Sequence, residues 1–308
     1  MEISKFMNSL LKDPIDIMKG IWKRCEPYVS DELFLKVQFR LAVGYWPNLK
    51  NPKSLNEKIQ WLKLHTHFKE YSTLVDKYEV KKFVTKRIGK KYVIPTYGIY
   101  DSIGEIKWDE LPNQFVLKST SDSGGVIICK DKENFNILSA INTLKKCNKY
   151  NYYKYNKEYP YKDVSTRYIA EAYIEDESGC ELKDYKFFCF EGEPKFLFVA
   201  SGRQNGNLTF DFYDMEWNYI NVSNGHPQYG NKYRKPKVFV EMVDICRELS
   251  KNINFVRVDL YVDKNDNIYF GELTFFHCSG VNPFDPIKYD YLFGSYLKLP
   301  NTCVSVQK

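Results

Sequence analysis

The clearest pattern along the chain is an alternation of apolar and polar residues in two neighbouring segments near its C-terminal end. Residues 255–262 read FVRVDLYV, residues 268–275 read IYFGELTF, and a polar stretch rich in Asp and Asn joins them. Alternation with a period of two is typical of a half-buried strand, and Asp and Asn favour turns. The pattern therefore predicts a β-hairpin over residues 255–275.

The two arms of this hairpin carry polar side chains that pairing brings together. If the apolar faces stay on one side, Asp259 lies opposite Glu272 and Arg257 lies opposite Thr274. Two carboxylates opposed across strands repel each other unless a cation lies between them. A hard divalent cation such as Mg²⁺ would account for this arrangement, because it binds one or two carboxylates together with phosphate oxygens. A solvated strand face with mixed charges is the alternative that this segment alone leaves open.

The remaining pattern divides the chain into a helical part followed by mixed elements. Residues 1–75 are helix-like, with a capping-box sequence at Ser54 and Glu57 and a second helix start at Ser30. Residues 76–87 also have a helical pattern. Strands are predicted at 92–100, 114–118, 126–129, 167–174, 184–190 and 195–199, and further helices at 133–147 and 239–251.

One segment has no periodicity. Residues 150–162 contain six Tyr together with Lys and Asn, which predicts a mobile loop. Such a loop can serve as a lid or as a surface on which saccharides stack, and an ordinary surface loop is an equal alternative.

Composition narrows the class of protein. Of 308 residues, 44% are hydrophobic and 27% are charged, as in a soluble globular protein. The net charge of +6 fits an anionic ligand but is too diffuse to indicate a nucleic-acid partner. Eight cysteines without a C-x-x-C pair indicate reduced thiols in the cytoplasm. No apolar run approaches the roughly 20 residues of a membrane span. The amphipathic segment 6–22 can rest on an anionic membrane surface or pack on the fold.

A second candidate site surrounds Lys118. This lysine ends a predicted buried strand, where an ammonium group is costly unless it meets an anion. Ser123, Gly124 and Gly125 follow in a loop whose hydroxyl and unhindered backbone N–H groups suit a polyphosphate. The loop does not match the Walker pattern G-x-x-x-x-G-K-[ST], so it is not a P-loop.

Read in order, these segments resemble the ATP-grasp superfamily over roughly residues 76–280. Asp76-Lys77 opens a helix, Lys118 and its loop follow, and residues 169–174 (IAEAYI) are similar to an adenine-binding hinge. The hairpin resembles the metal site R-x-D … E-x-N of that superfamily, with Thr274 in place of the usual Asn. A Thr hydroxyl can still ligate a metal or bond a phosphate.

The chain resembles one family within this superfamily more closely. Residues 55–61 (LNEKIQW), 182–188 (LKDYKFF), 257–259 (RVD) and 270–274 (FGELT) are similar to signatures of the TupA-like ATP-grasp family. That family occurs among bacterial surface-polysaccharide genes. The resemblance covers the chain from about residue 35 onward.

The resemblance implies roles for the nucleotide-binding residues. Lys77 and Lys118 would hold phosphates, with Ser123, Gly124 and Gly125 closing over them. Glu171 would accept from the adenine amino group, while Tyr173 and Ile174 would supply backbone contacts and an apolar wall; Asp184 would bond the ribose.

It also implies a metal site and two catalytic residues. Asp259, Glu272 and Thr274 would hold Mg²⁺ at the phosphates of ATP. Arg257 would stabilise charge on the transferred phosphoryl group, and Lys186 would reach phosphate or substrate.

Other side chains are weaker candidates. His277 follows the metal strand and either touches substrate or is a satisfied structural histidine, and Arg203 and residues 214–217 are candidates for an acceptor pocket.

The fold implied is an α+β ATP-grasp fold in three parts. Residues 1–75 would form a helical N-terminal lobe, residues 76–170 the lid or small subdomain, and residues 171–308 the large subdomain with the metal site. The two subdomains would clasp ATP between them.

The activity implied is carboxylate–amine ligation through an acyl phosphate. Its partners would be ATP, Mg²⁺, a sugar- or glycan-linked carboxylate such as a uronic acid, and an amine such as an amino acid. We expect a cytoplasmic enzyme of surface-polysaccharide or capsule synthesis, with peripheral contact to the inner membrane face as an option. A kinase that phosphorylates a glycan hydroxyl and a non-catalytic glycan-binding protein are the alternatives.

Overall fold

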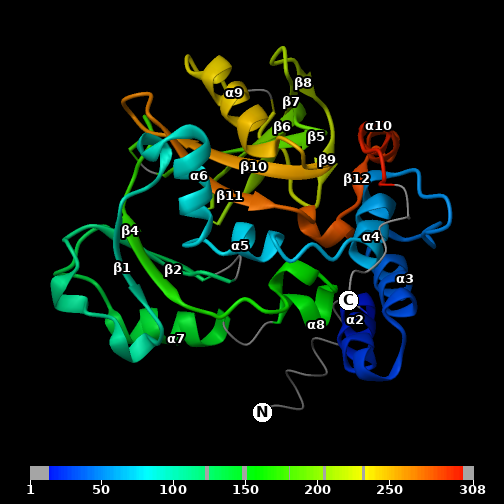
Figure 1. Cartoon of the computed structure of the whole chain (residues 1–308), viewed down its shortest axis with the longest axis horizontal. Helices are drawn as coiled ribbons and strands as arrows, with labels where there is room; N and C mark the ends of the chain where they lie inside the picture. Colours follow the sequence, from blue (N-terminus) through cyan, green and yellow to red (C-terminus); the bar gives the residue numbers. More distant parts are fainter. Residues whose placement is uncertain are drawn as a thin grey trace.

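Two antiparallel sheets, each with helices packed against it, form the body of the molecule (Figure 1). The structure is a computed structural model and describes residues 14–121, 125–147, 151–179, 181–203, 206–230 and 233–300. The small sheet has the strand order β1 (Thr96–Tyr100), β4 (Tyr168–Ala172), β2 (Phe115–Ser119) and β3 (Val126–Cys129). The large sheet has the order β11 (Ile268–Thr274), β10 (Phe255–Val262), β5 (Asp184–Phe190), β6 (Glu193–Ser201), β7 (Thr209–Asp214) and β8 (Tyr219–Ile220). A third pair joins β9 (Ser223–Asn224) to β12 (Phe284–Asp285).

The hairpin predicted from the alternating pattern is confirmed as β10 and β11. Its register places Asp259 opposite Glu272 and Arg257 opposite Thr274, with a bulge after Asp259. On its other side β10 pairs with β5, where Lys186 lies opposite Asp259. Three charged residues therefore stand in a row across three adjacent strands.

The helices are α2 (Pro14–Arg24), α3 (Asp31–Val43), α4 (Leu55–His65), α5 (Tyr71–Val75), α6 (Val80–Ile88), α7 (Ile137–Cys147), α8 (Tyr152–Asn156), α9 (Phe239–Ser250) and α10 (Lys288–Tyr296). Five of them, α2 to α6, precede the first strand in the sequence, and the others follow the strands of the small or the large sheet. The predicted capping box of Ser54 and Glu57 is present at α4, and Ser30 caps α3. The Asp76 carboxylate accepts from the backbone N–H groups of Tyr78 and Glu79, in the turn that leads into α6.

Two apolar cores hold the sheets. The larger one, between the large sheet and helices such as α9, is dominated by phenylalanines: Phe196 stacks on Phe188 at 4.4 Å and on Phe293 at 3.8 Å between ring centroids. Burying each such ring contributes roughly 1.5–3 kcal/mol, so β5, β6 and β10 form a rigid platform. The smaller core packs α7 on the small sheet through Leu117 and Leu144.

The tyrosine-rich segment differs from its prediction. Residues 151–162 form α8 and a 3₁₀ turn at Tyr159–Tyr161, and Lys157 bridges Glu26 and Asp31 of the N-terminal helices. The prediction of a mobile loop is therefore wrong for these described residues, because long-range ion pairs that no local pattern reveals hold the segment. Tyr150 lies outside the described residues.

The N-terminal helix α2 packs on α3 through Trp22, whose ring stacks on Phe34 and whose indole N–H donates to the Phe34 carbonyl. Its Ile15, Met18 and Ile21 side chains are exposed. Among the described residues, no helix combines the length and apolarity needed to cross a membrane. The predicted division at residue 170 falls within β4 and stays a prediction.

Candidate nucleotide cleft and acceptor cavity

A cleft of about 180 Å³ lies between the two sheets and collects most of the described residues predicted to bind nucleotide. Its lining includes five of them, Lys77, Lys118, Tyr173, Ile174 and Asp184, together with the predicted catalytic residue Lys186 and the predicted metal ligand Glu272. These residues come from the turn before α6 (Val80–Ile88), from the small sheet and the segment after β4, and from the large sheet. The fold therefore brings together side chains that are far apart in the sequence.

One wall of the cleft is apolar although it faces solvent. On β3, Ile127 and Cys129 are buried in the small core, whereas Val126 and Ile128 are 44% and 37% exposed and line the cleft. Val116 and Ile174 extend this surface. An apolar wall with a few convergent polar groups is typical of a site for a flat organic ring.

A cluster of three charges lies on the small sheet beside this wall. The Glu171 carboxylate on β4 pairs with Lys118 of β2 at 2.9 Å and with Lys81 of α6. Burial alone would raise the pKa of Glu171, but the charges of Lys118 and Lys81 outweigh it and hold that pKa below its ordinary value. We call these three residues the small-sheet cluster.

This geometry favours a different role for Glu171 from the predicted one. Its side chain is 6% exposed and both of its oxygens are paired with lysines. It is therefore placed to hold Lys118 at the cleft, and acceptance from an adenine amino group stays a prediction. Lys81 was missed by sequence reasoning, because its partner Glu171 lies far from it in the sequence.

A second cluster lies on the large sheet across the cleft. Arg257 forms a two-pronged ion pair with Asp259, with both N···O distances at 2.7 Å, and Lys186 bonds the same carboxylate. Arg257 Nη2 also donates to Glu272 Oε1 and to the Thr274 hydroxyl, each at 3.0 Å. Enclosure in the cleft would raise the pKa of Glu272, but Lys186, Arg257 and Lys77 lower it to about 2. Lys186, Arg257, Asp259 and Glu272 form the large-sheet cluster.

His277 contacts this cluster through Arg257. Arg257 Nη1 lies 2.8 Å from His277 Nδ1, and the opposite ring nitrogen lies 2.8 Å from Asn224 Oδ1. An arginine can only donate, so Nδ1 accepts and Nε2–H donates to Asn224. Burial and the neighbouring charges of Arg257 and Lys186 hold the pKa of His277 well below its ordinary value. The imidazole is thus neutral with both ring nitrogens hydrogen-bonded, which favours the structural role over the substrate contact that the sequence also left open.

Asp184 adds an acceptor to the cleft. Its carboxylate pairs with Lys186 at 3.2 Å, while its Oδ1 atom is buried without a hydrogen-bond partner in the described structure. A buried oxygen of this kind is unusual unless a ligand or water completes it. Asp184 lines the cleft, and its contact with a ribose hydroxyl stays a prediction.

The predicted phosphate loop is described only in part. Ser123 and Gly124 lie outside the described residues, and Gly125 is buried directly before β3. Lys77 lines the cleft, and its backbone N–H donates to the carbonyl of Thr120, the second residue after Lys118. Lys77 and Lys118 therefore reach the same cleft from two elements joined at that contact.

The three predicted Mg²⁺ ligands differ in how well they can reach a metal ion in the cleft. Within the described ranges, no three His, Cys, Asp or Glu side chains converge as an all-protein metal site requires. Glu272, 34% exposed at its side chain, faces the cleft, and Thr274 stands beside it. Asp259 is fully buried with both oxygens engaged by cations. One carboxylate plus phosphate oxygens suffices for Mg²⁺, so the residues fit a metal that arrives with a nucleotide.

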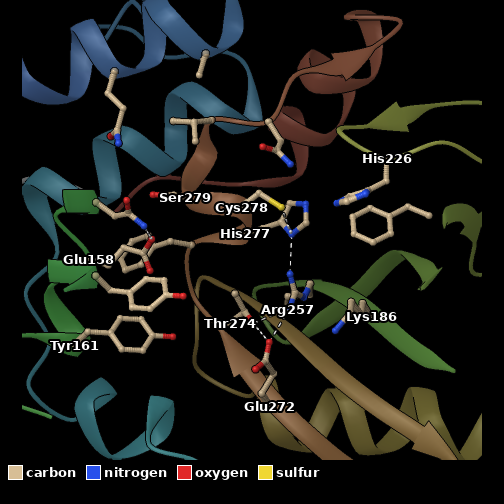
Figure 2. Close-up of a pocket in the computed structure, with 18 of the residues that line it drawn as sticks. Glu158, Tyr161, Lys186, His226, Arg257, Glu272, Thr274, His277, Cys278 and Ser279 are labelled. Carbon is tan, nitrogen blue, oxygen red and sulfur yellow. Dashed lines mark hydrogen bonds and ion pairs between the residues drawn. The ribbon is translucent and has the colours of Figure 1, made fainter. Parts of the chain in front are cut away.

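A larger cavity of about 730 Å³ adjoins the cleft (Figure 2). Four residues line both spaces: Lys77, Lys186, Arg203 and Glu272. The cavity wall also carries Arg257, Thr274 and several aromatic side chains. Arg203 lines this cavity, in agreement with its prediction as an acceptor-pocket residue. Residues 214–217, predicted for the same pocket, do not line it: Trp217 stacks on Tyr213, and Asp214 bonds Asn218 in a turn.

Comparison with known proteins identifies a family. The model of a family described as TupA-like ATP-grasp matches residues 57–298 of this chain. No curated protein matches the sequence.

Solved structures resemble the chain only distantly, with low sequence identity and low TM-scores. An ADP complex of N5-carboxyaminoimidazole synthetase from Staphylococcus aureus is 13% identical with a TM-score of 0.44, covering 81% of this chain and 61% of that one. D-alanine–D-alanine ligase from Bacillus anthracis is 17% identical with a TM-score of 0.38, covering 66% and 57%. The chain thus spans less than two thirds of the length of these proteins, and likenesses this distant add nothing to the family assignment.

Proposed function

Because this chain belongs to the TupA-like ATP-grasp family, we propose that it is an ATP-dependent carboxylate–amine ligase that acts on a sugar acid. The observation that carries the proposal is the junction of the cleft with the larger cavity. Lys186 and Glu272 line both spaces, and Arg257 of the same large-sheet cluster lines the cavity. A phosphoryl group of ATP in the cleft would therefore meet an acceptor in the cavity at cationic side chains.

The chemistry follows from this placement. ATP would phosphorylate the acceptor carboxylate, and an amine would then displace phosphate from the acyl phosphate to give an amide. Lys77, Lys118 and Lys186 would hold the phosphates, and Arg257 would stabilise charge on the transferred group. Glu272, with Thr274, would hold Mg²⁺, which offsets phosphate charge when bound. Most of the catalytic gain would come from positioning and charge neutralisation.

The composition of the cavity supports a sugar acid as the acceptor. Its lining carries six cationic side chains (Lys19, Lys23, Lys77, Lys186, Arg203 and Arg257) and two carboxylates (Glu158 and Glu272). Aromatic rings from Trp22, Tyr152, Tyr161 and Phe210 share the wall. Cations suit a carboxylate, and aromatic faces suit the apolar faces of a sugar ring. The proposal includes a role in surface-polysaccharide synthesis in the cytoplasm. Contact of α2 with the inner membrane face is an option within it.

The test is the trapping of the acyl phosphate. The protein would be incubated with ATP, Mg²⁺, hydroxylamine and a panel of uronic acids, free and nucleotide-linked, and hydroxamate and phosphate would be measured. We expect hydroxamate with one or more acids, and none from Glu272→Gln, while Glu193→Gln on the exposed start of β6 behaves as wild type. A stable phosphoester without hydroxamate would instead establish the kinase alternative, and absence of ATP turnover would favour a non-catalytic binding protein.

A further inference from the structure

We propose that Glu158 is the anionic group of an ammonium-binding subsite in the larger cavity, where the amine substrate docks. The inference rests on the proposed ligase function and adds to it the residue that selects and receives the amine. Glu158 lies in the segment that the sequence left as a loop, and no role was predicted for it.

The segment holds Glu158 in a fixed place. Lys157 adopts a left-handed conformation (φ 58°) after α8 and is anchored to Glu26 and Asp31. The next residue, Glu158, is 6% exposed and contributes to the cavity wall, as does Asn156. Its carboxylate is therefore pre-positioned.

The charge of Glu158 has no direct cationic partner among the described residues. The nearby buried ammonium of Lys63 places its three N–H groups on Gln60 Oε1 at 3.3 Å, the Ser279 carbonyl at 2.7 Å and the Ser279 hydroxyl at 2.6 Å. Ser279 in turn bonds the Glu158 carboxylate, which also accepts from the Asn156 amide at 3.1 Å. A carboxylate accepts about four hydrogen bonds, so acceptor capacity remains for a ligand.

The turn that carries Ser279 is itself built for this contact. Cys278, Ser279 and Gly280 all have left-handed φ values, of 45°, 56° and 61°. A side chain at Gly280 would come within 2.5 Å of the Gln60 amide. Successive left-handed residues other than glycine cost free energy and persist only where the surrounding structure over-determines them, which is frequent at active sites and ligand clamps. Here they place Ser279 between Lys63 and Glu158.

Glu158 lies apart from the cations of the large-sheet cluster. Figure 2 shows Glu158 and Tyr161 on one side of the pocket, and Arg257 and Lys186 on the other. Arg257 and Lys186 suit the carboxylate that receives phosphate, whereas the Glu158 carboxylate suits an ammonium group. Separate places for the two substrates would position them for ligation.

The reaction step balances with Glu158 as the proton acceptor. The bound ammonium gives one proton to the Glu158 carboxylate, and the neutral nitrogen attacks the acyl carbon. The C–N bond forms, the C–O bond to phosphate breaks, and phosphate leaves with the electron pair and the second proton. Burial raises the pKa of Glu158 against the opposing charge of Lys63, which favours this proton uptake.

The experiment separates the amine step from acyl phosphate formation. Hydroxylamine is uncharged near neutral pH and needs no ammonium subsite. Wild type and Glu158→Gln would be assayed with ATP, Mg²⁺ and the uronic acid that gives hydroxamate, using either hydroxylamine or a panel of glycine, L-alanine, L-serine and L-lysine. We expect Glu158→Gln to form hydroxamate near the wild-type rate but to lose amide formation by about 100-fold, the scale of a lost general base. Glu158→Asp should recover part of the loss.

Two controls keep the outcomes distinct. Glu158→Gln leaves Lys63 buried without a compensating charge, so the double change Glu158→Gln/Lys63→Met removes both charges and should show the same selective loss. Equal loss of hydroxamate and amide in the double variant would overturn the subsite. Hydroxamate without an amide from any amine of the panel in wild type would also overturn it. No hydroxamate from wild type with any acid would instead be failure of the proposed ligase function.

Discussion

Two buried charge clusters face the cleft from opposite sheets, and they use their carboxylates in different ways. In the small-sheet cluster one carboxylate, Glu171, is shared by two lysines, which leaves one positive charge in excess. In the large-sheet cluster two carboxylates balance two cations, and Glu272 remains at the cleft surface. The small sheet therefore presents positive charge suited to phosphate, whereas the large sheet presents an acid suited to a metal ion.

The large-sheet cluster also shows that two carboxylates opposed across strands do not by themselves indicate a metal site. Asp259 and Glu272 are opposed across two strands as predicted, but the cation between them is the protein's own Arg257. Arginine suits such a position because its planar fork bonds two acceptors at once. Asp259 thus acts as the anchor of Arg257, and only Glu272 is left to face a metal.

The largest expected effect comes from breaking the large-sheet cluster. Arg257→Met would leave Asp259 enclosed with Lys186 alone, at a cost of about 3–5 kcal/mol in the free energy of unfolding. Arg247→Met is the matched control: Arg247 is 48% exposed at its side chain and pairs with surface acids, so its loss should cost under about 1 kcal/mol. Urea denaturation measures both, and equal losses would contradict the account.

The small-sheet cluster should separate its two lysines by function. Lys118 lines the cleft, while Lys81 bonds the Ile94 carbonyl and the Thr96 hydroxyl beside it. Lys118→Met should weaken ADP binding about tenfold, or ~1.4 kcal/mol, and Lys81→Met by clearly less. Calorimetric titration decides this, and an equal loss from both variants would show that Lys118 has no special place at the phosphates.

The apolar wall should matter for binding and little for folding. Ile128→Ser removes an exposed apolar side chain that lines the cleft, so ADP affinity should fall by about 1 kcal/mol with nearly unchanged stability. Val240→Ser, at a position on α9 that is 70% exposed, should change neither. An unaltered affinity of Ile128→Ser for ADP would show that the adenine base does not pack on this apolar wall.

The smallest effect is a pH dependence of stability. The folded pKa of Glu272 is about 2 against an ordinary 4.5, so its stabilising contribution is present above pH 4.5 and lost as the pH falls toward 2. After allowance for solvent screening we expect about 1 kcal/mol. Between pH 5 and pH 3, Glu272→Gln should lose less free energy of unfolding than wild type, and parallel curves would refute the assignment.

Local pattern predicted much of this molecule. The TupA-like family, and with it the ATP-grasp fold expected from the motifs, is confirmed. So are the hairpin register and the helix cap at Ser54, because alternation and capping are written into neighbouring residues.

What local pattern could not reveal are partners that are distant in sequence. Lys81 reaches Glu171 across 90 positions of chain, and Lys63 reaches Ser279 across 216. The ordering of residues 151–162 depends on ion pairs to the N-terminal helices. Such contacts form only once the sheets are packed, so Glu158 gave no signal in the sequence.

The most direct test of the account is calorimetric titration of ADP, with and without Mg²⁺, into wild type, Glu272→Gln and the control Glu193→Gln. The account predicts that Mg²⁺ tightens ADP binding to wild type and to the control by about tenfold or more. Glu272→Gln should still bind ADP but lose that enhancement. Enhancement that persists in Glu272→Gln, or a folded wild type that binds no ADP, would contradict the assignment of the cleft.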